Sequence, residues 1–173
     1  MPTKILAELA KPNFAGRKVL ILYYSRTGHT RTVANQIHGL VGGDMVELRT
    51  VQPYPDDYDA LVAQNVEEQR SDYMPPLQTT IDNLRDYDVV FIGSPLWNVR
   101  LTPPVRSFLS SHDLSGKIIA PFVTYIVSGL GRSRRDIQEL CPDASVLDGL
   151  AVLGEAAGEA QTAVSEWLRG LRL

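Results

Sequence analysis

Three short stretches of almost continuous apolar residues mark the strongest strands that the sequence predicts. They span residues 18–25, 88–93 and 117–124, and none of them alternates cleanly between polar and apolar positions. Continuous runs of this length are typical of strands that are covered on both faces of a parallel sheet. Residues 45–48 alternate and are therefore expected nearer an edge, and residues 145–153 predict a weaker fifth strand.

Between these runs the apolar residues recur at helical spacing. The stripe within residues 33–41 predicts a helix that ends at Gly42. Similar stripes predict a helix opened by Pro103, one stopped by Pro142 and a C-terminal one over residues 164–171. Strands and helices thus alternate, which predicts a three-layer αβα fold around a five-stranded parallel sheet.

The connection after the second strand is the irregular part of this pattern. Residues 51–79 hold four prolines around a helix-like piece. A connection of this length is either an ordinary surface excursion or a functional loop, and both interpretations stay open. We expect one domain over residues 17–173, preceded by an N-terminal extension over residues 1–16.

Composition and charge exclude several classes of protein. Hydrophobic residues make up 44% and charged residues 21% of the 173 residues, which is typical of a folded domain rather than of a disordered chain. The net charge of −3 is too nearly balanced for a protein that coats nucleic acid. A single cysteine excludes an intramolecular disulfide and a Cys-rich zinc site, and the histidine spacing gives no metal site.

Hydropathy along the chain indicates in which cellular compartment the protein is expected. No apolar run reaches the roughly 20 residues that a membrane-spanning helix needs. The first residues lack the apolar core of a secretory signal. We therefore expect a cytoplasmic protein without a membrane span.

The most informative segment directly follows the first predicted strand and leads into the first helix. It consists of Ser25, Arg26, Thr27, Gly28, His29 and Thr30. Free backbone N–H groups of such a turn and of the following helix converge on one point, where the helix dipole favours an anion. Gly28 can adopt positive φ and lets the backbone approach a ligand. The loop suits a phosphate monoester that is bound without being hydrolysed, and the alternative is an ordinary N-cap formed by Thr27 or Thr30.

Other phosphate-binding and nucleophilic motifs are absent from the sequence. There is no P-loop pattern, and no G-x-S-x-G that would place a nucleophilic serine. The only G-x-G, at residues 129–131, has Arg134 where the third glycine of a dinucleotide fingerprint belongs. Cys141 lacks an arginine six positions later, so it does not form a thiol-phosphatase loop.

The strand and loop over residues 18–30, read as a strand followed by S-x-T-G-x-T, resemble the FMN phosphate loop of the flavodoxin family. Residues 93–98 resemble the second flavin loop of that family, and residues 124–131 resemble the third. The three motifs stand in the right order after the expected strands. The resemblance implies the strand order 2-1-3-4-5, with FMN bound at the switch between strands 1 and 3.

The resemblance also implies a role for each loop. The first loop would hold the phosphate. The second and third would position and frame the flavin ring through Ser94, Pro95, Leu96, Trp97, Asn98, Thr124, Tyr125, Ser128 and Gly129. Within this set, Trp97 is the candidate for stacking on the ring, whereas Trp167 is expected to pack in the core. Arg100 is the one candidate catalytic residue, because an inward guanidinium would favour a reduced anionic flavin or an anionic substrate; it is otherwise a surface arginine.

Two functional classes remain open. The first is an oxidoreductase that takes a hydride from NAD(P)H and reduces a quinone-like or other small acceptor. The second is a one-electron carrier that docks on larger redox proteins. A homodimer stays open for either class, and a flavodoxin-like module without flavin is a third, weaker interpretation.

Two departures from the carrier pattern favour the enzyme. Carriers are usually strongly acidic, whereas this chain is nearly neutral. Carriers also often place a glycine beside the flavin, whereas residues 97–100 contain none, and β-branched Val99 is expected to resist positive φ. We therefore expect effectively two-electron reduction.

Overall fold

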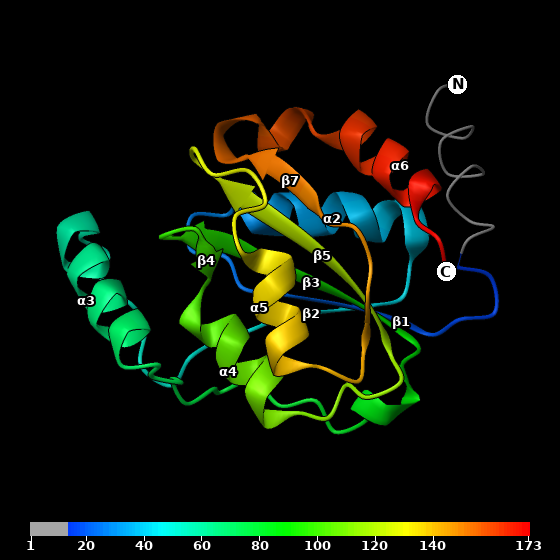
Figure 1. The fold of residues 1–173 in the computed structure, drawn as a ribbon. Helices are drawn as coiled ribbons and strands as arrows, with labels where there is room; N and C mark the ends of the chain where they lie inside the picture. The colour runs from blue at the N-terminus through cyan, green and yellow to red at the C-terminus, as the bar shows by residue number, and fades with distance from the viewer. Residues whose placement is uncertain (1–13) are drawn as a thin grey trace.

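The computed structural model describes residues 14–173 and shows a parallel sheet between two layers of helices (Figure 1). The strands are β1 (Val19–Tyr23), β2 (Asp44–Glu47), β3 (Val89–Trp97), β4 (Arg100–Leu101), β5 (Ile118–Tyr125), β6 (Ser145–Val146) and β7 (Leu150–Leu153). The sheet has the order β2-β1-β3-β5-β6, while β7 also pairs with β5, and the short β4 pairs antiparallel with β3. The chain leaves β1 for one edge and returns to β3 on the other side, so the topological switch lies between β1 and β3.

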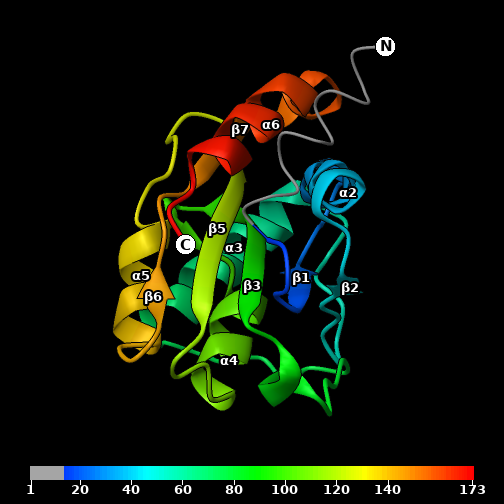
Figure 2. The ribbon, with the colours of Figure 1, turned by 90° about the vertical axis from the view of Figure 1, so that its right-hand side faces the viewer.

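Helices cover both faces of this sheet. One face carries α2 (His29–Val41), η3 (Gly154–Glu159) and α6 (Gln161–Gly170), and the other carries α4 (Pro103–Ser111) and α5 (Ser133–Leu140) (Figure 2). A short η2 (Leu84–Asp86) precedes β3. None of the helices within residues 14–173 is long and apolar enough to cross a bilayer.

Alternate residues of the central strands fill two separate cores. Ile21 and Phe91 pack under α2 and α6, whereas Leu20, Leu22 and Ile92 pack under α4 and α5. This double burial explains why the strands read as continuous apolar runs. The predicted three-layer fold and the strand order 2-1-3-4-5 are confirmed, with β5 as the fourth strand and the β6–β7 pair as the fifth.

The predicted fifth strand is interrupted, for a reason that lies in β5. Leu147 donates its N–H to the carbonyl of Ile119, so Ile119 faces the fifth strand. Residue 121 faces the same way because directions repeat every second residue, but Pro121 has no N–H to donate. Residues 147–149 therefore leave the ladder, and pairing resumes where Leu150 meets Phe122.

The described chain begins with Phe14, which falls in the predicted extension over residues 1–16. Its ring packs against Phe91 at 5.6 Å between centroids, and Phe14 belongs to the core beneath α2. The rest of the predicted extension, residues 1–13, lies outside the described residues.

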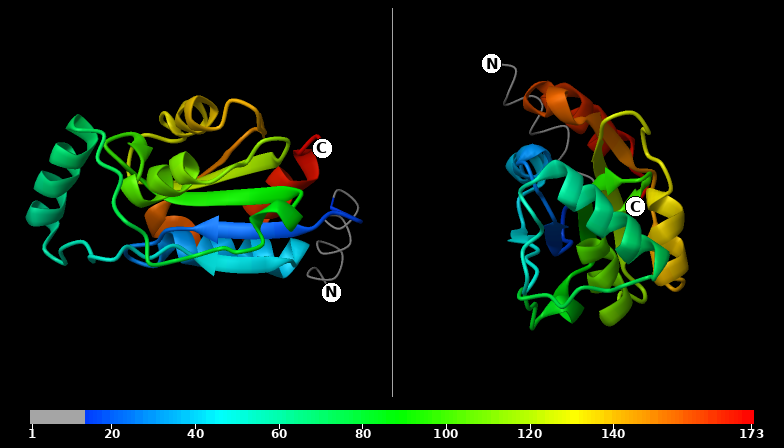
Figure 3. Two further views of the ribbon diagram at one scale, coloured as in Figure 1. Left: turned by 90° about the horizontal axis from the view of Figure 1, so that it is seen from below. Right: turned by 90° about the vertical axis from the view of Figure 1, so that its left-hand side faces the viewer.

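The irregular connection over residues 51–79 forms an arm, which we call the α3 arm after its helix α3 (Tyr58–Arg70). Figure 3 shows α3 standing beyond the carboxyl ends of the strands, away from the two helical layers. The base of the arm is closed by hydrogen bonds that pair Val51 with Pro76 and Gln78 with Arg49. At the start of α3, Asp57 accepts the N–H of Ala60 at 2.9 Å, which makes it the N-cap.

Candidate functional site

The loop after β1 is shaped around Gly28 and the first turn of α2. Gly28 is the N-cap residue with φ 98° and ψ −8°, and no side chain caps the helix there. The Ser25 hydroxyl accepts the N–H groups of Gly28 at 3.1 Å and Arg31 at 3.3 Å, which fixes the turn. The ordinary N-cap by Thr27 or Thr30 is therefore not what forms.

Three backbone donors of this loop are left for a ligand. Among the described residues, the N–H groups of Thr27, His29 and Thr30 donate to no protein acceptor. A side chain on Gly28 would face open space, since its nearest neighbour would be the Arg31 guanidinium at 3.8 Å. Free donors, the positive end of a 13-residue helix and an open approach together form a site for an anion.

The hydroxyl of Thr30 serves a different purpose. Thr30 and Thr124 are both buried, and their hydroxyl oxygens lie 2.8 Å apart. This bond ties the start of α2 to the end of β5, and so ties the first loop to the third. The structure thus brings together two predicted site residues that are 94 positions apart, with their side chains directed at each other.

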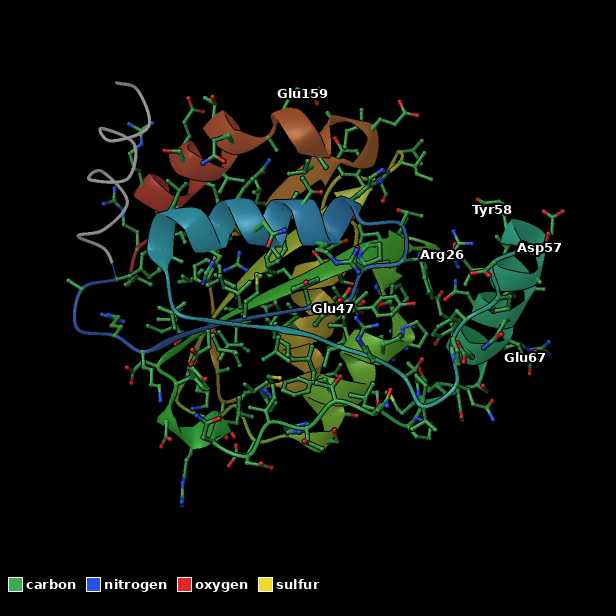
Figure 4. The ribbon with its side chains drawn as sticks, turned by 180° about the vertical axis from the view of Figure 1, so that it is seen from behind. Arg26, Glu47, Asp57, Tyr58, Glu67 and Glu159 are labelled. Carbon is green, nitrogen blue, oxygen red and sulfur yellow. The ribbon has the colours of Figure 1, made fainter. Side chains whose placement is uncertain are left out.

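Arg26 faces the α3 arm. Its guanidinium donates to the carbonyl of Asp56 at 2.8 Å. Figure 4 shows Arg26 between the body of the fold and α3, where Asp57 and Tyr58 are labelled. The arm therefore contacts the first loop. His29 is exposed at the other side of the loop and packs on Gly154, where an added Cβ would lie 2.6 Å from its Nδ1 atom.

The second predicted loop is a β-hairpin rather than an irregular loop. β3 continues through Ser94 and Pro95 to Trp97, where Leu96 pairs with Leu101 and Trp97 pairs with Arg100. Ser94 is fully buried and bonds to Thr102, while Pro95 lies opposite Thr124 in the sheet register. Asn98 and Val99 form the two-residue turn, which points out of the carboxyl edge of the sheet.

Val99 adopts positive φ, although its β-branched side chain is expected to keep the loop out of that conformation. Asn98 has φ 51° and Val99 has φ 59°, the pair of left-handed conformations that a tight hairpin turn of type I′ needs. Contacts on both sides of the turn hold it there. The carbonyl of Trp97 accepts the Gln69 amide at 2.7 Å, and the carbonyl of Val99 accepts the N–H of Arg132 at 2.8 Å.

Val99→Gly is expected to raise stability. A β-branched residue in the left-handed region carries a strain on the order of 1–2 kcal/mol. The loss of unfolded-state entropy for glycine offsets about 0.5–1 kcal/mol of that gain. The melting temperature should rise by roughly 1–4 °C. The control is Val127→Gly, at an exposed loop position outside the left-handed region, which should lower stability or leave it unchanged. A lower melting temperature for Val99→Gly would show that the turn is not strained.

Trp97 is held in a cluster of aromatic rings. Its ring centroid lies 5.1 Å from that of Tyr54 and 5.8 Å from that of Tyr24, with edge-to-face geometry in both cases. Burial raises the pKa of Tyr24 to about 12. Burial and a hydrogen bond to Glu68 raise the pKa of Tyr54. Both tyrosines therefore stay neutral around Trp97 at physiological pH.

The third predicted loop follows β5 and lies against the hairpin. Tyr125 ends the strand, and a turn closes where Gly131 donates to the carbonyl of Ser128. Gly129 and Gly131 have φ 59° and 51°, and a Cβ on Gly131 would lie 2.4 Å from the carbonyl oxygen of Val99. The three predicted loops thus meet at the carboxyl edge of the sheet, at its topological switch.

Arg100 is neither free nor on the surface. Its side chain is only 20% exposed and pairs at 3.4 Å with Asp136, which is fully buried on α5. As the cross-strand partner of Trp97, Arg100 stands on the same face of the hairpin.

Sequence reasoning missed Tyr24, Tyr54 and Gln69. The sequence places Tyr24 only within the first predicted strand, Tyr54 and Gln69 lie in no motif, and only the length of residues 51–79 hinted that the arm would have a role.

Two hollows of the surface lie away from these loops. One, of about 510 Å³, is lined by Arg17, Arg85 and Lys117 at the amino end of the sheet. The other, of about 550 Å³, lies between the base of the α3 arm and α4. At the loop site, the space around the Cβ position of Gly28 is open.

Comparison with known proteins places this geometry in a family. The model of a family described as flavodoxin matches residues 18–171. Among curated proteins, an NAD(P)H dehydrogenase (quinone) of Azorhizobium caulinodans is 30% identical over 116 residues, which cover 62% of this chain and 56% of that protein. A flavodoxin of Synechocystis is 29% identical over 109 residues, 61% of this chain and 50% of its own. The chain spans about half the length of these curated relatives.

Solved structures show the same fold over nearly the whole chain. A putative flavoprotein of Bacteroides uniformis matches with a TM-score of 0.79 and 25% identity, covering 89% of this chain and 99% of that one. A flavoprotein of Lactobacillus acidophilus, solved in complex with FMN, matches with a TM-score of 0.68 and 21% identity, covering 83% and 98%. The converging loops, the strand order and the family match agree, and the chain belongs to the flavodoxin family.

Proposed function

We propose that this protein binds FMN and acts as an NAD(P)H-dependent oxidoreductase that reduces a quinone-like or other small acceptor. The observation that carries the proposal is the set of unpartnered N–H groups of Thr27, His29 and Thr30 around Gly28. They stand at the switch between β1 and β3, where folds of this type bind nucleotides. A relative named NAD(P)H dehydrogenase (quinone) and a similar structure that holds FMN support it.

The residues present fit this cofactor. The free N–H groups would hold the phosphate, and the Ser25 hydroxyl would keep the loop in shape. Trp97 would stack on the flavin ring, held in place by Tyr24 and Tyr54. Backbone groups of the third loop would meet the polar side of the ring and favour its negative charge after reduction. When bound, FMN would supply the hydride and electron chemistry that the protein side chains lack.

A one-electron carrier is the alternative, and two of the three peptides of the hairpin turn favour the enzyme over it. A carrier is helped by a backbone carbonyl that turns towards the half-reduced flavin. Here the carbonyls of Trp97 and Val99 are already engaged by Gln69 and Arg132. Turning either peptide would break a hydrogen bond of 2.7–2.8 Å. The net charge of −3 also offers little steering towards a protein partner.

The test is anaerobic mixing of the FMN-loaded protein with NADH or NADPH in a stopped-flow spectrometer. We expect loss of the oxidised flavin absorbance within the mixing experiment, and its return when benzoquinone is added. Free FMN at the same concentration is the control. Flavin that stays oxidised with both nucleotides, yet is reduced by a ferredoxin-type protein donor, would favour the carrier.

A further inference from the structure

Arg106, in the first turn of α4, is a buried arginine with unused donors. Its side chain is 6% exposed, and within residues 14–173 only its Nη2 atom has a partner, Asp72 at 3.0 Å. Its Nε and Nη1 atoms are buried without a hydrogen-bond acceptor in the part of the chain that the structure describes. Unpaired charged donors in a protein interior are unfavourable, so this arginine is incompletely matched by the protein itself.

The partner of Arg106 is the largely solvent-exposed carboxylate of Asp72. Asp72 follows the end of α3, and its side chain is 71% exposed. Its backbone adopts φ 51°, a left-handed conformation that aspartate adopts more readily than most residues other than glycine. Hydrogen bonding and charge from Arg106, followed by the more distant charge of Arg100, hold the pKa of Asp72 below its ordinary value. Asp72 is therefore ionised, and it lies on the exposed α3 arm, where Arg106 is the partner of its carboxylate.

Arg100, whose charge also lowers the pKa of Asp72, is likewise incompletely matched. Its Nη2 atom pairs with buried Asp136, while its Nε atom is buried without an acceptor. Asp136 is shared, since it also lies 4.0 Å from Arg132 and accepts the N–H of Leu101. Two guanidinium groups thus share the carboxylate of Asp136, while Arg106 has the exposed Asp72 as its partner.

This cluster adjoins the place where the proposed reaction occurs. Arg100 is the cross-strand partner of Trp97, the residue expected to stack on the flavin. The α3 arm that carries Asp72 also holds the Trp97 carbonyl through Gln69. A negative group bound between the arginines would thus lie next to the hairpin and could belong to a molecule that reaches the flavin.

We propose that Arg100 and Arg106 bind the negative group, a carboxylate or a phosphate, of the small-molecule substrate, and that Asp72 occupies this position until the substrate displaces it. The proposal rests on the proposed function for the identity of the bound molecule as a substrate. Exchange of one carboxylate for another anion keeps the charge of Arg106 compensated. A forked carboxylate or phosphate can also accept the donors that Asp72 leaves free.

The first experiment measures anion binding without any catalysis. The melting temperature of the FMN-loaded protein is followed against inorganic phosphate and, separately, benzoate, at constant ionic strength. Asp72→Asn removes a tethered competitor, so half-saturation should fall about tenfold or more. Arg106→Gln and the less buried Arg100→Gln should weaken binding by a similar factor.

An exposed ion pair between α5 and the segment that joins β6 to β7 supplies the control. Arg134 pairs with Asp148 at 3.2 Å on the surface, so Asp148→Asn and Arg134→Gln make the same charge changes away from the cluster. These two variants should leave the anion response unchanged. Equal responses of Asp72→Asn and Asp148→Asn would overturn the site, as would a wild-type protein and an Asp72→Asn variant that respond to neither anion.

The second experiment identifies which molecule brings the charge. Steady-state KM values of wild type and Asp72→Asn are compared for NADH, NADPH, benzoquinone and a carboxylated benzoquinone. A lower KM for NADPH alone assigns the site to the donor phosphate, and a lower KM for the carboxylated quinone alone assigns it to the acceptor. Unchanged KM values for all charged substrates would overturn the proposal. If the protein binds FMN but neither nucleotide reduces the bound flavin, the proposed function is refuted. The melting experiment would then still test whether the anion site exists.

Discussion

Gly28→Val should weaken FMN binding by roughly 100-fold or more and bring its affinity close to that of riboflavin. Each hydrogen bond from a free N–H group to the phosphate contributes about 1.5–3 kcal/mol, and 1.4 kcal/mol corresponds to tenfold. Valine at φ 98° would distort the turn that aligns these donors, and its side chain would fill the open space before them. Titration of the apoprotein with FMN, followed by the quenching of flavin fluorescence, measures the loss.

A second glycine separates this effect from simple destabilisation. Gly116 has φ 75° and open space around its Cβ position, and it precedes β5 at the opposite end of the sheet. Gly116→Val therefore carries a similar conformational strain, on the order of 1–2 kcal/mol, far from the loops. It should lower the melting temperature but leave FMN affinity unchanged. If the wild-type protein binds riboflavin as tightly as FMN, residues 25–30 do not bind the FMN phosphate.

The first loop could be predicted because its chemistry is local. A strand, a turn with a single glycine and a helix start occupy residues 18–30, and Gly28 takes the left-handed conformation that the motif requires. The alternation of strands and helices likewise follows from continuous apolar runs and helical stripes, which encode burial directly, whereas the strand order is implied only by the family resemblance. Where a single segment contains both the cause and the consequence, the sequence is sufficient.

The hairpin shows why other features could not be read in advance. Val99 adopts φ 59° against its intrinsic preference, because Arg132 and Gln69, from two other parts of the chain, hold the turn. The contacts of Arg100 and Arg106 likewise could not be predicted from the local sequence. Arg106 lies among the apolar positions of an amphipathic helix, and only the folded arm brings Asp72 to it. Such contacts depend on tertiary packing, which overrides local propensity and leaves no spacing signal.

The two tryptophans should respond to truncation in opposite ways. Trp97→Ala should weaken FMN binding about tenfold or more and brighten the flavin that remains bound. Stacking contributes about 0.5–1.5 kcal/mol beyond the area it buries, and the indole is the quencher. Because Tyr24 and Tyr54 pack against the same ring, this variant also loses some stability, so affinity is measured well below its melting temperature.

Trp167→Ala is the matched truncation outside the site. The Trp167 ring packs on Phe91 at 5.7 Å, and its N–H donates to the carbonyl of Asp148 at 2.9 Å, on the layer formed by α2 and α6. Since the ring is only partly buried, we expect a loss of about 1–3 kcal/mol, below the 3–5 kcal/mol typical of a fully buried tryptophan. FMN affinity and the fluorescence of bound flavin should stay at wild-type values in the folded protein. If Trp167→Ala instead brightens the flavin while Trp97→Ala only lowers the melting temperature, the flavin does not stack on the hairpin, and the ring must lie on the opposite side of the sheet.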